Sequence, residues 1–205
     1  MAKNLALFLS YLFMPLLMPT LVFVFLLFGI PQVAYLNNYN KVLILAMVFV
    51  TTFLVPLISL LTMKLTKHIG SLHLDSREDR VFPFSTISLF YILSTYLFYV
   101  KLDVEPIFIL TLASISICVT LLASITFFWK ISAHMTGMAG LTAIVMVFAV
   151  KYPTVDLLPL VLVSVVATGA VGSARLRLNA HRPIEILGGF ALGFLICFFS
   201  FFLFL

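Results

Sequence analysis

Seven long apolar segments separated by short polar stretches dominate this sequence. They cover roughly residues 5–29, 41–63, 84–100, 106–128, 134–150, 156–173 and 183–205. About 20 apolar residues span the hydrocarbon core of a bilayer as an α-helix, and only helices or closed barrels satisfy every backbone polar group there. We therefore expect an all-α protein, a polytopic transmembrane helical bundle with a six-helix core and room for a seventh span. Pro15 and Pro19 predict a kink or break in the first segment.

The composition predicts a protein embedded in the membrane without an extramembrane domain. Of the 205 residues, 63% are hydrophobic and 9% are charged, and the mean hydropathy is +1.25. The sequence shows no internal repeat or linker, so we expect residues 1–205 to form a single integral membrane domain. The first segment lacks a small-residue cleavage site, and we expect it to be retained as a span. The expected location is a bacterial inner (cytoplasmic) membrane, which the protein crosses several times.

Neither the net charge nor the cysteines indicate a soluble partner or a cofactor. The formal net charge is +5, but no polar domain presents the basic residues to a nucleic acid. Basic residues at a membrane interface are better suited to phosphate or lipid headgroups. Cys118 and Cys197 both lie inside apolar segments, which predicts packing residues rather than a disulfide or a metal site. We expect no metal and no cofactor.

Most polar residues gather in loops that share one face of the membrane. If every segment spans, the loops after the second, fourth and sixth segments lie on the same side. Of the lysines and arginines, the opposite loops hold only Lys41, Lys101 and Lys151. The positive-inside rule accounts for the other Lys and Arg residues, which lie on the face of the loops after the second, fourth and sixth segments, but it says nothing about histidine. The same face carries all 4 histidines, which are His68, His73, His134 and His181. Their gathering on one face favours a single site built from three loops.

The start of the last segment combines a cation, a histidine and a carboxylate. Glu185 follows His181 by one helical turn, so its carboxylate can reach the imidazole on the same helix face. A neutral imidazole can attack phosphorus when its second nitrogen donates to such a carboxylate, and Arg175 can hold phosphate oxygens through its guanidinium. Pro183 fits the first turn of a helix. The alternative is an interfacial ion pair of Glu185 with Arg175 or Arg182, which anchors the helix end.

A second group of polar residues stands at the start of the fifth segment. Ser132 is a suitable N-cap, and together with backbone N–H groups it could hold phosphate oxygens. His134 is suited to protonate a leaving alkoxide, and Lys130 adds a cation. The alternative is a capped helix with an interfacial histidine and a lysine whose stem lies along the membrane edge.

A third group, Arg77-Glu78-Asp79-Arg80, follows the longest polar stretch of the chain. Arg77 and Arg80 could supply further cations for a phosphate. The alternative is a solvated loop with local ion pairs, each of little energetic value. We favour the loop for Glu78 and Asp79 and leave both possibilities open for the arginines.

Glycines in the last segment predict a close helix–helix contact. Gly189 and Gly193 form a GxxxG pair, a spacing at which small residues allow two membrane helices to approach each other. Such packing would also bring the segment that carries His181 next to the segment that carries His134. We expect the phenylalanine-rich stretch after these glycines, residues 194–204, to face lipid.

These motifs resemble those of the type 2 phosphatidic acid phosphatase superfamily. Its third motif is Ser-Arg, five residues, His, three residues and Asp, followed by glycines; here Arg175, His181 and Glu185 stand at that spacing, with Ala174 for Ser and Glu for Asp. The sequence Ile131-Ser132-Ala133-His134 is similar to its second motif, Pro-Ser-Gly-His. The resemblance covers roughly residues 60–200 and implies that His181 is the nucleophile, Glu185 its orienting carboxylate and His134 the general acid. Ser132 and Arg175 would be phosphate ligands.

The first motif of that family, Lys, six residues and Arg-Pro, is matched less closely. Arg80 takes the arginine position, His73 stands where the lysine is expected, and Val81 stands in place of the proline. Arg77 or Lys67 could substitute for the missing cation.

We therefore expect metal-independent hydrolysis of a lipid phosphate or diphosphate monoester through a phosphohistidine intermediate. The partners implied are a lipid phosphate substrate and membrane lipids, with no nucleic acid. A lipid phosphotransferase that uses the same site is the near alternative, and a non-enzymatic lipid-phosphate binder or transporter is the other. Because a transporter is expected to carry polar residues deep within its spans, the ionisable residues at the segment edges favour the enzyme.

Overall fold

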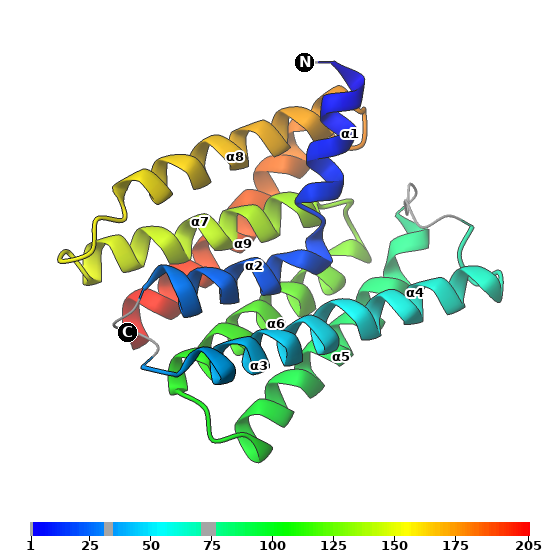
Figure 1. The fold of residues 1–205 in the computed structure, drawn as a ribbon. Coiled ribbons are helices and arrows are strands. Elements are labelled where there is room, and N and C mark those ends of the chain that lie inside the picture. The colour runs from blue at the N-terminus through cyan, green and yellow to red at the C-terminus, as the bar shows by residue number, and fades with distance from the viewer. Residues whose placement is uncertain (1, 31–34, 71–76) are drawn as a thin grey trace. The chain divides into compact units, whose positions relative to one another are not determined.

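The computed structural model describes residues 2–30, 35–70 and 77–205, and these ranges contain helices and no strand. The all-α class is therefore confirmed (Figure 1). The α-helices are α1 (Lys3–Leu12), α2 (Met18–Val24), α3 (Asn38–Phe49), α4 (Val55–Leu65), α5 (Glu78–Lys101), α6 (Pro106–Thr126), α7 (Ala133–Lys151), α8 (Leu158–Arg177) and α9 (Pro183–Phe204). Short η turns interrupt the first two spans, at Pro15–Leu17 (η1), Phe25–Gly29 (η2) and Val50–Leu54 (η3).

Seven helical segments within the described residues are long and apolar enough to cross a membrane. They are Lys3–Gly29, Asn38–Leu65, Glu78–Lys101, Pro106–Thr126, Ala133–Lys151, Leu158–Arg177 and Pro183–Phe204. All seven expected spans are present, and the protein is a multi-pass integral membrane protein. The third span begins earlier than expected, because Glu78 and Asp79 form the first turn of α5 rather than a loop. Acidic residues in a first turn stabilise the N-terminal end of a helix, where the helix dipole is positive.

The first span is broken, as its prolines predict. Met14 adopts an extended conformation (φ −61°, ψ 136°), as a residue before a proline tends to do, and α1 ends two residues earlier at Leu12. Pro15 then starts η1, and Pro19 lies in the first turn of α2, where a missing N–H costs little. The N-terminal half of this span is therefore a separate short helix.

The chain divides into two compact units. One unit consists of Met1–Met18 and Trp129–Leu205; it contains α1, α7, α8 and α9, and α1 packs against α8. The other consists of Pro19–Phe128 and contains α2 to α6. We refer to them as the C-terminal unit and the central unit. We had expected a single domain over residues 1–205, and that remains a prediction.

Hydroxyl groups join the helices of the central unit. In the contact between α5 and α6, the hydroxyl of Ser88 lies 2.8 Å from that of Thr120. The Tyr91 hydroxyl donates to the backbone carbonyl of Thr52 in the π-helical turn η3 (3.1 Å). A π-helical turn disturbs the regular i to i−4 hydrogen bonds, and the tyrosine hydroxyl satisfies one carbonyl at this point.

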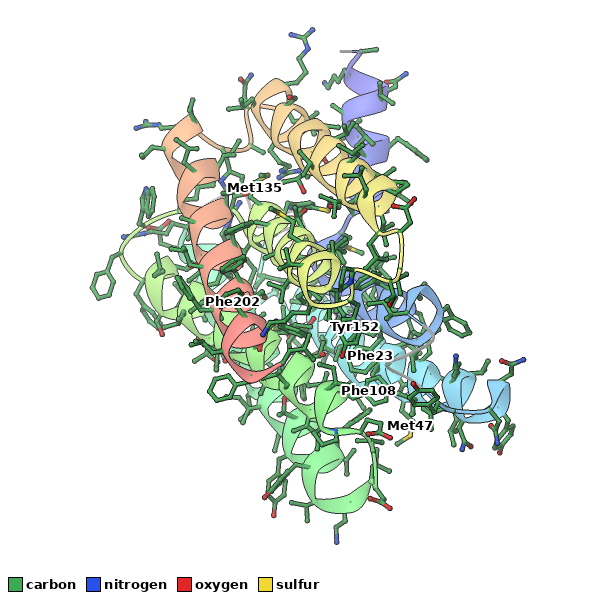
Figure 2. The ribbon with its side chains drawn as sticks, turned by 90° about the vertical axis from the view of Figure 1, so that its left-hand side faces the viewer. Phe23, Met47, Phe108, Met135, Tyr152 and Phe202 are labelled. Carbon is green, nitrogen blue, oxygen red and sulfur yellow. The ribbon has the colours of Figure 1, made fainter. Side chains whose placement is uncertain are left out.

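In the C-terminal unit, α7 lies between α8 and α9 (Figure 2). It is the most buried span, with 61% of its most apolar stretch buried, against 28% for α8 and for α9. On the α8 side, the Thr142 hydroxyl lies 2.9 Å from that of Thr168. Met135, labelled in Figure 2, packs against Gly172 of α8. On the α9 side the two helices approach through glycines.

The predicted GxxxG contact is confirmed, and its partner is α7. A Cβ atom at Gly189 would overlap the carbonyl oxygen of Ser132, and one at Gly193 would overlap that of Thr136. Both obstacles are backbone atoms of α7, which cannot swing away as the end of a side chain can. The two glycines therefore fix how closely the N-terminal half of α9 lies against the start of α7.

We expect Gly193→Ala to lower the free energy of unfolding of the protein in detergent by about 1–3 kcal/mol, and with it the melting temperature, because the added methyl group overpacks a backbone contact. The matched control is Gly169→Ala on α8, where no atom lies within 4 Å of an added Cβ. That control should leave stability unchanged or raise it by up to about 1 kcal/mol, since alanine favours the helix. Equal melting temperatures for the two variants would contradict the close α7–α9 contact.

Candidate active site

His181 and Glu185 form a buried hydrogen-bonded pair at the start of α9. Asn179 adopts a left-handed conformation (φ 51°), which reverses the chain between α8 and α9 and places His181 just before the helix. His181 Nδ1 lies 2.9 Å from Glu185 Oε2, and the two side chains are 2% and 11% exposed. The spacing in the sequence predicted this contact, and the structure contains it.

The neighbouring backbone holds the Glu185 carboxylate in position. Its Oε2 atom also accepts a hydrogen bond from the backbone N–H of Arg182, the N-cap of α9 (3.1 Å). Because the carboxylate acts as an acceptor in both contacts, the hydrogen of the neutral imidazole lies on Nδ1 of His181. Nε2 then carries the lone pair. This tautomer is the one in which Nε2 is a nucleophile.

Ser132 joins the start of α7 to this pair. It is the N-cap of α7, as predicted, and its backbone N–H donates to the Glu185 carbonyl oxygen (3.2 Å). Its side chain does not cap the helix. The Ser132 hydroxyl is buried and makes no hydrogen bond to the described residues. A buried hydroxyl without a partner is costly and is often a sign of a ligand site, so this oxygen is well suited to bind a phosphate.

His134 and Arg175 meet at Ser10 of α1, a residue to which no sequence motif pointed. His134 Nε2 lies 3.1 Å from the Ser10 carbonyl oxygen, and Arg175 Nη1 donates to Ser10 Oγ (3.2 Å). Since a carbonyl oxygen only accepts, Nε2 of His134 carries a hydrogen. His134, in the first turn of α7, and Arg175, in the last turn of α8, are thus brought to one place.

The break in the first span explains why the carbonyl oxygen of Ser10 is available to His134. In a continuous helix the Ser10 carbonyl would accept from the N–H of Met14, but that N–H is directed to the Tyr11 carbonyl oxygen instead (3.3 Å). His134 takes the place of Met14. Pro15 was the sequence signal for this break, yet the sequence did not indicate which residue would use the released carbonyl.

Lys130 belongs to the same unit and lies, half-buried, two residues before Ser132 in the loop between α6 and α7. The C-terminal unit therefore contains six of the eight residues that the sequence suggested for the site. These are Lys130, Ser132, His134, Arg175, His181 and Glu185.

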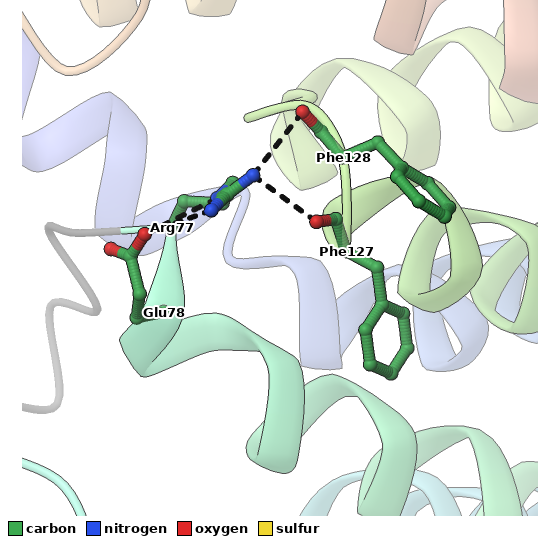
Figure 3. A network of polar contacts seen from close by, with 4 residues as sticks. All are labelled: Arg77, Glu78, Phe127 and Phe128. Atoms are coloured by element: carbon green, nitrogen blue, oxygen red, sulfur yellow. Dashed lines mark hydrogen bonds and ion pairs between the residues drawn. The ribbon is translucent and has the colours of Figure 1, made fainter.

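Arg77 lies in the central unit, where it links two helix ends (Figure 3). Its Nη1 donates to the carbonyl oxygens of Phe127 (3.1 Å) and Phe128 (3.4 Å), at the C-terminal end of α6. Its Nη2 pairs with Glu78 Oε1 (3.0 Å). A cation at a helix C-terminus is stabilised by the helix dipole. Of the predicted alternatives, the local ion pair is present, while the role of Arg77 in phosphate binding stays a prediction.

Arg80 also lies in the central unit, in the first turn of α5, and is 5% exposed. Its predicted role as a phosphate ligand stays a prediction. His73, which stands at the lysine position of the first motif, lies outside the described residues. His68 is exposed, and its Nδ1 lies 2.8 Å from the Thr66 hydroxyl.

The donors of the C-terminal unit suit an anion. Arg175, Lys130 and the N–H groups of the nearby helix ends are cations and donors, whereas no group of three or more His, Cys, Asp or Glu in the described residues is arranged to bind a metal. Searches with this sequence and structure matched no family model, no curated protein and no solved structure.

Proposed function

We propose that the chain is a membrane lipid phosphatase that hydrolyses a phosphate or diphosphate monoester through a phosphohistidine at His181. The observation that carries this proposal is the buried pair of His181 Nδ1 and Glu185 Oε2, 2.9 Å apart. The pair leaves Nε2 of His181 as a lone-pair donor and places a carboxylate where it stabilises the positive charge that develops on the ring.

In the first step, His181 Nε2 forms a bond to phosphorus while the ester P–O bond breaks. His134 reacts as the imidazolium: the leaving oxygen takes its Nε2 proton, the ring becomes neutral, and the product departs as the lipid alcohol or, from a diphosphate, as the lipid monophosphate. The phosphoryl oxygens bind to Arg175 and to the Ser132 hydroxyl, which stabilise the charge of the transition state. Glu185 stabilises the ring cation.

In the second step, a water molecule attacks phosphorus and the N–P bond of the phosphohistidine breaks. His134, which lost its proton in the first step, accepts one proton of the water. Inorganic phosphate leaves, and His181 regains its lone pair. If an alcohol takes the place of water, the same site acts as a phosphotransferase.

The position of these residues in the chain supports a lipid substrate. They lie at the ends of α7, α8 and α9, where a membrane span meets the headgroup region, and the seven spans leave short connections between them. A phosphate attached to a lipid reaches such a position by lateral diffusion. We propose a bacterial inner (cytoplasmic) membrane as the location of the protein.

The test is phosphate release from a panel of lipid phosphates by the purified protein, with EDTA present. We expect release to continue under chelation, because arginine, lysine and N–H donors provide the charge stabilisation. Vanadate should inhibit, since it adopts the trigonal-bipyramidal geometry of phosphoryl transfer and binds the same donors. Activity that disappears in EDTA and returns with magnesium would contradict this site, as would a lack of release from every lipid.

A further inference from the structure

The C-terminal end of α1 binds two groups that the proposed reaction directs at the phosphate. Arg175 Nη1 donates to Ser10 Oγ, and His134 Nε2 donates to the Ser10 carbonyl oxygen. We propose that Ser10 is a positioning residue: its two oxygens hold these donors in the resting site, and the substrate phosphate must displace the end of α1 to bind. We call these two hydrogen bonds the Ser10 contact. The kinetic part of this inference rests on the proposed function.

Ser10 offers the two donors the kind of surface that a phosphate would offer. Its hydroxyl hydrogen is directed to the Ala6 carbonyl oxygen (2.9 Å), so lone pairs face Arg175. Its carbonyl is among the last four of α1, which lie at the negative end of the helix dipole. Both oxygens are therefore acceptors with partial negative charge. Phosphate oxygens have the same character with more charge.

The chemistry requires the Ser10 contact to open. His134 can protonate the leaving oxygen only when its Nε2 hydrogen points at that oxygen, and it now points at the Ser10 carbonyl. A phosphate oxygen carries a full negative charge, so it attracts the Arg175 guanidinium more strongly than the neutral hydroxyl of Ser10 does. A phosphate therefore replaces the neutral oxygens of Ser10, and without phosphate the contact closes again.

The form of α1 allows this movement. It is a helix of 10 residues that ends at the break before Pro15, so it can shift without moving a whole span. It packs beside α8 within the C-terminal unit (Figure 1). Much of its remaining surface is exposed to the surroundings of the protein, including Leu5, Phe8, Tyr11 and Leu12.

The first test is Ser10→Ala, which removes the hydroxyl acceptor of Arg175. We expect KM for the lipid phosphate and the inhibition constant of vanadate both to fall by about three- to tenfold, with kcat unchanged. Ser10→Thr retains a hydroxyl and should resemble the parent. The matched control is Ser85→Ala on α5, an exposed serine whose hydroxyl also binds the carbonyl four residues earlier (2.8 Å). It should change neither constant.

The second test leaves Ser10 intact and follows α1 itself. A nitroxide spin label on Phe8→Cys reports the mobility of α1, because Phe8 is 60% exposed and the native Cys118 and Cys197 are buried. The control label on Ile58→Cys of α4 is 61% exposed and lies in the other unit. Vanadate should increase the mobility of the label at position 8 and leave the label at position 58 unchanged.

Each outcome bears on a separate claim. Two results would overturn the proposal for the Ser10 contact alone. One is that Ser10→Ala hydrolyses lipid phosphate with an unchanged or raised KM. The other is that vanadate inhibits the protein without changing the mobility of the label at position 8. Mobilisation of α1 by vanadate in a protein that hydrolyses no lipid phosphate would support the contact and overturn the proposed function. If vanadate does not bind and no lipid is hydrolysed, both proposals are wrong.

Discussion

His181→Ala should abolish phosphate release, with a loss of about 10⁵–10⁶-fold in kcat, as when other enzymes lose their nucleophile. The imidazole forms the covalent bond to phosphorus, and the other histidine of the C-terminal unit, His134, has its Nε2 hydrogen directed at Ser10. The measurement is phosphate release at saturating lipid, with the melting temperature of the variant recorded alongside.

His68→Ala is the control for His181→Ala. His68 is an exposed histidine of the central unit that contacts only Thr66 among the hydrogen bonds described for it, and its removal should leave turnover unchanged. Full activity in a folded His181→Ala protein would show that the covalent mechanism is wrong.

Glu185→Gln should preserve the fold and lower kcat by up to about 10⁴-fold, the loss known for replacing the carboxylate that orients a catalytic histidine by its amide. The amide oxygen can still accept from His181 Nδ1 and from the N–H of Arg182, the two contacts that the carboxylate makes. It cannot stabilise the positive ring by charge. Glu185→Asp keeps the charge and should retain activity within about tenfold of the parent.

The comparison of these two variants separates catalysis from anchoring. If Glu185 only held the start of α9, both variants would turn over lipid like the parent and differ from it in melting temperature. Steady-state kinetics and thermal unfolding on the same preparations decide between the two roles.

Much of the fold follows from the sequence, because the membrane allows few alternatives. A long apolar segment in a bilayer must form a helix, so the seven spans could be recognised by length and hydropathy. The contact of His181 with Glu185 follows from helical geometry over four residues. Gly189 and Gly193 likewise indicated a close contact, although the partner helix became evident only in the structure.

The orientation of each apolar helix could not be predicted as well. We expected residues 194–204 to face lipid, but Phe201 is fully buried and its ring centroid lies 5.9 Å from that of Phe148 on α7. Cys197 is buried as well. In a helix that is apolar on every side, hydrophobicity does not distinguish the buried face from the face toward lipid.

Contacts between residues far apart in the sequence were also beyond prediction. Ser10 lies 124 residues from His134 and 165 from Arg175 along the chain, and a single serine in an apolar span is common. Pro15 predicted the break, but the use of the released carbonyl depends on how α1 packs against α8. A contact of the central unit was unpredictable for the same reason, because Arg77 is separated by 50 residues of sequence from Phe127 at the end of α6.

The most direct test of the account is to trap the covalent intermediate. The protein is mixed with a lipid phosphate labelled at phosphorus, the reaction is stopped in alkali during the first turnover, and the labelled peptide is identified. We expect label on His181, stable in alkali and released by acid as for a phosphoramidate, and no label in His181→Ala. Label on another residue, or turnover by the parent protein without any covalent label, would contradict the proposed mechanism.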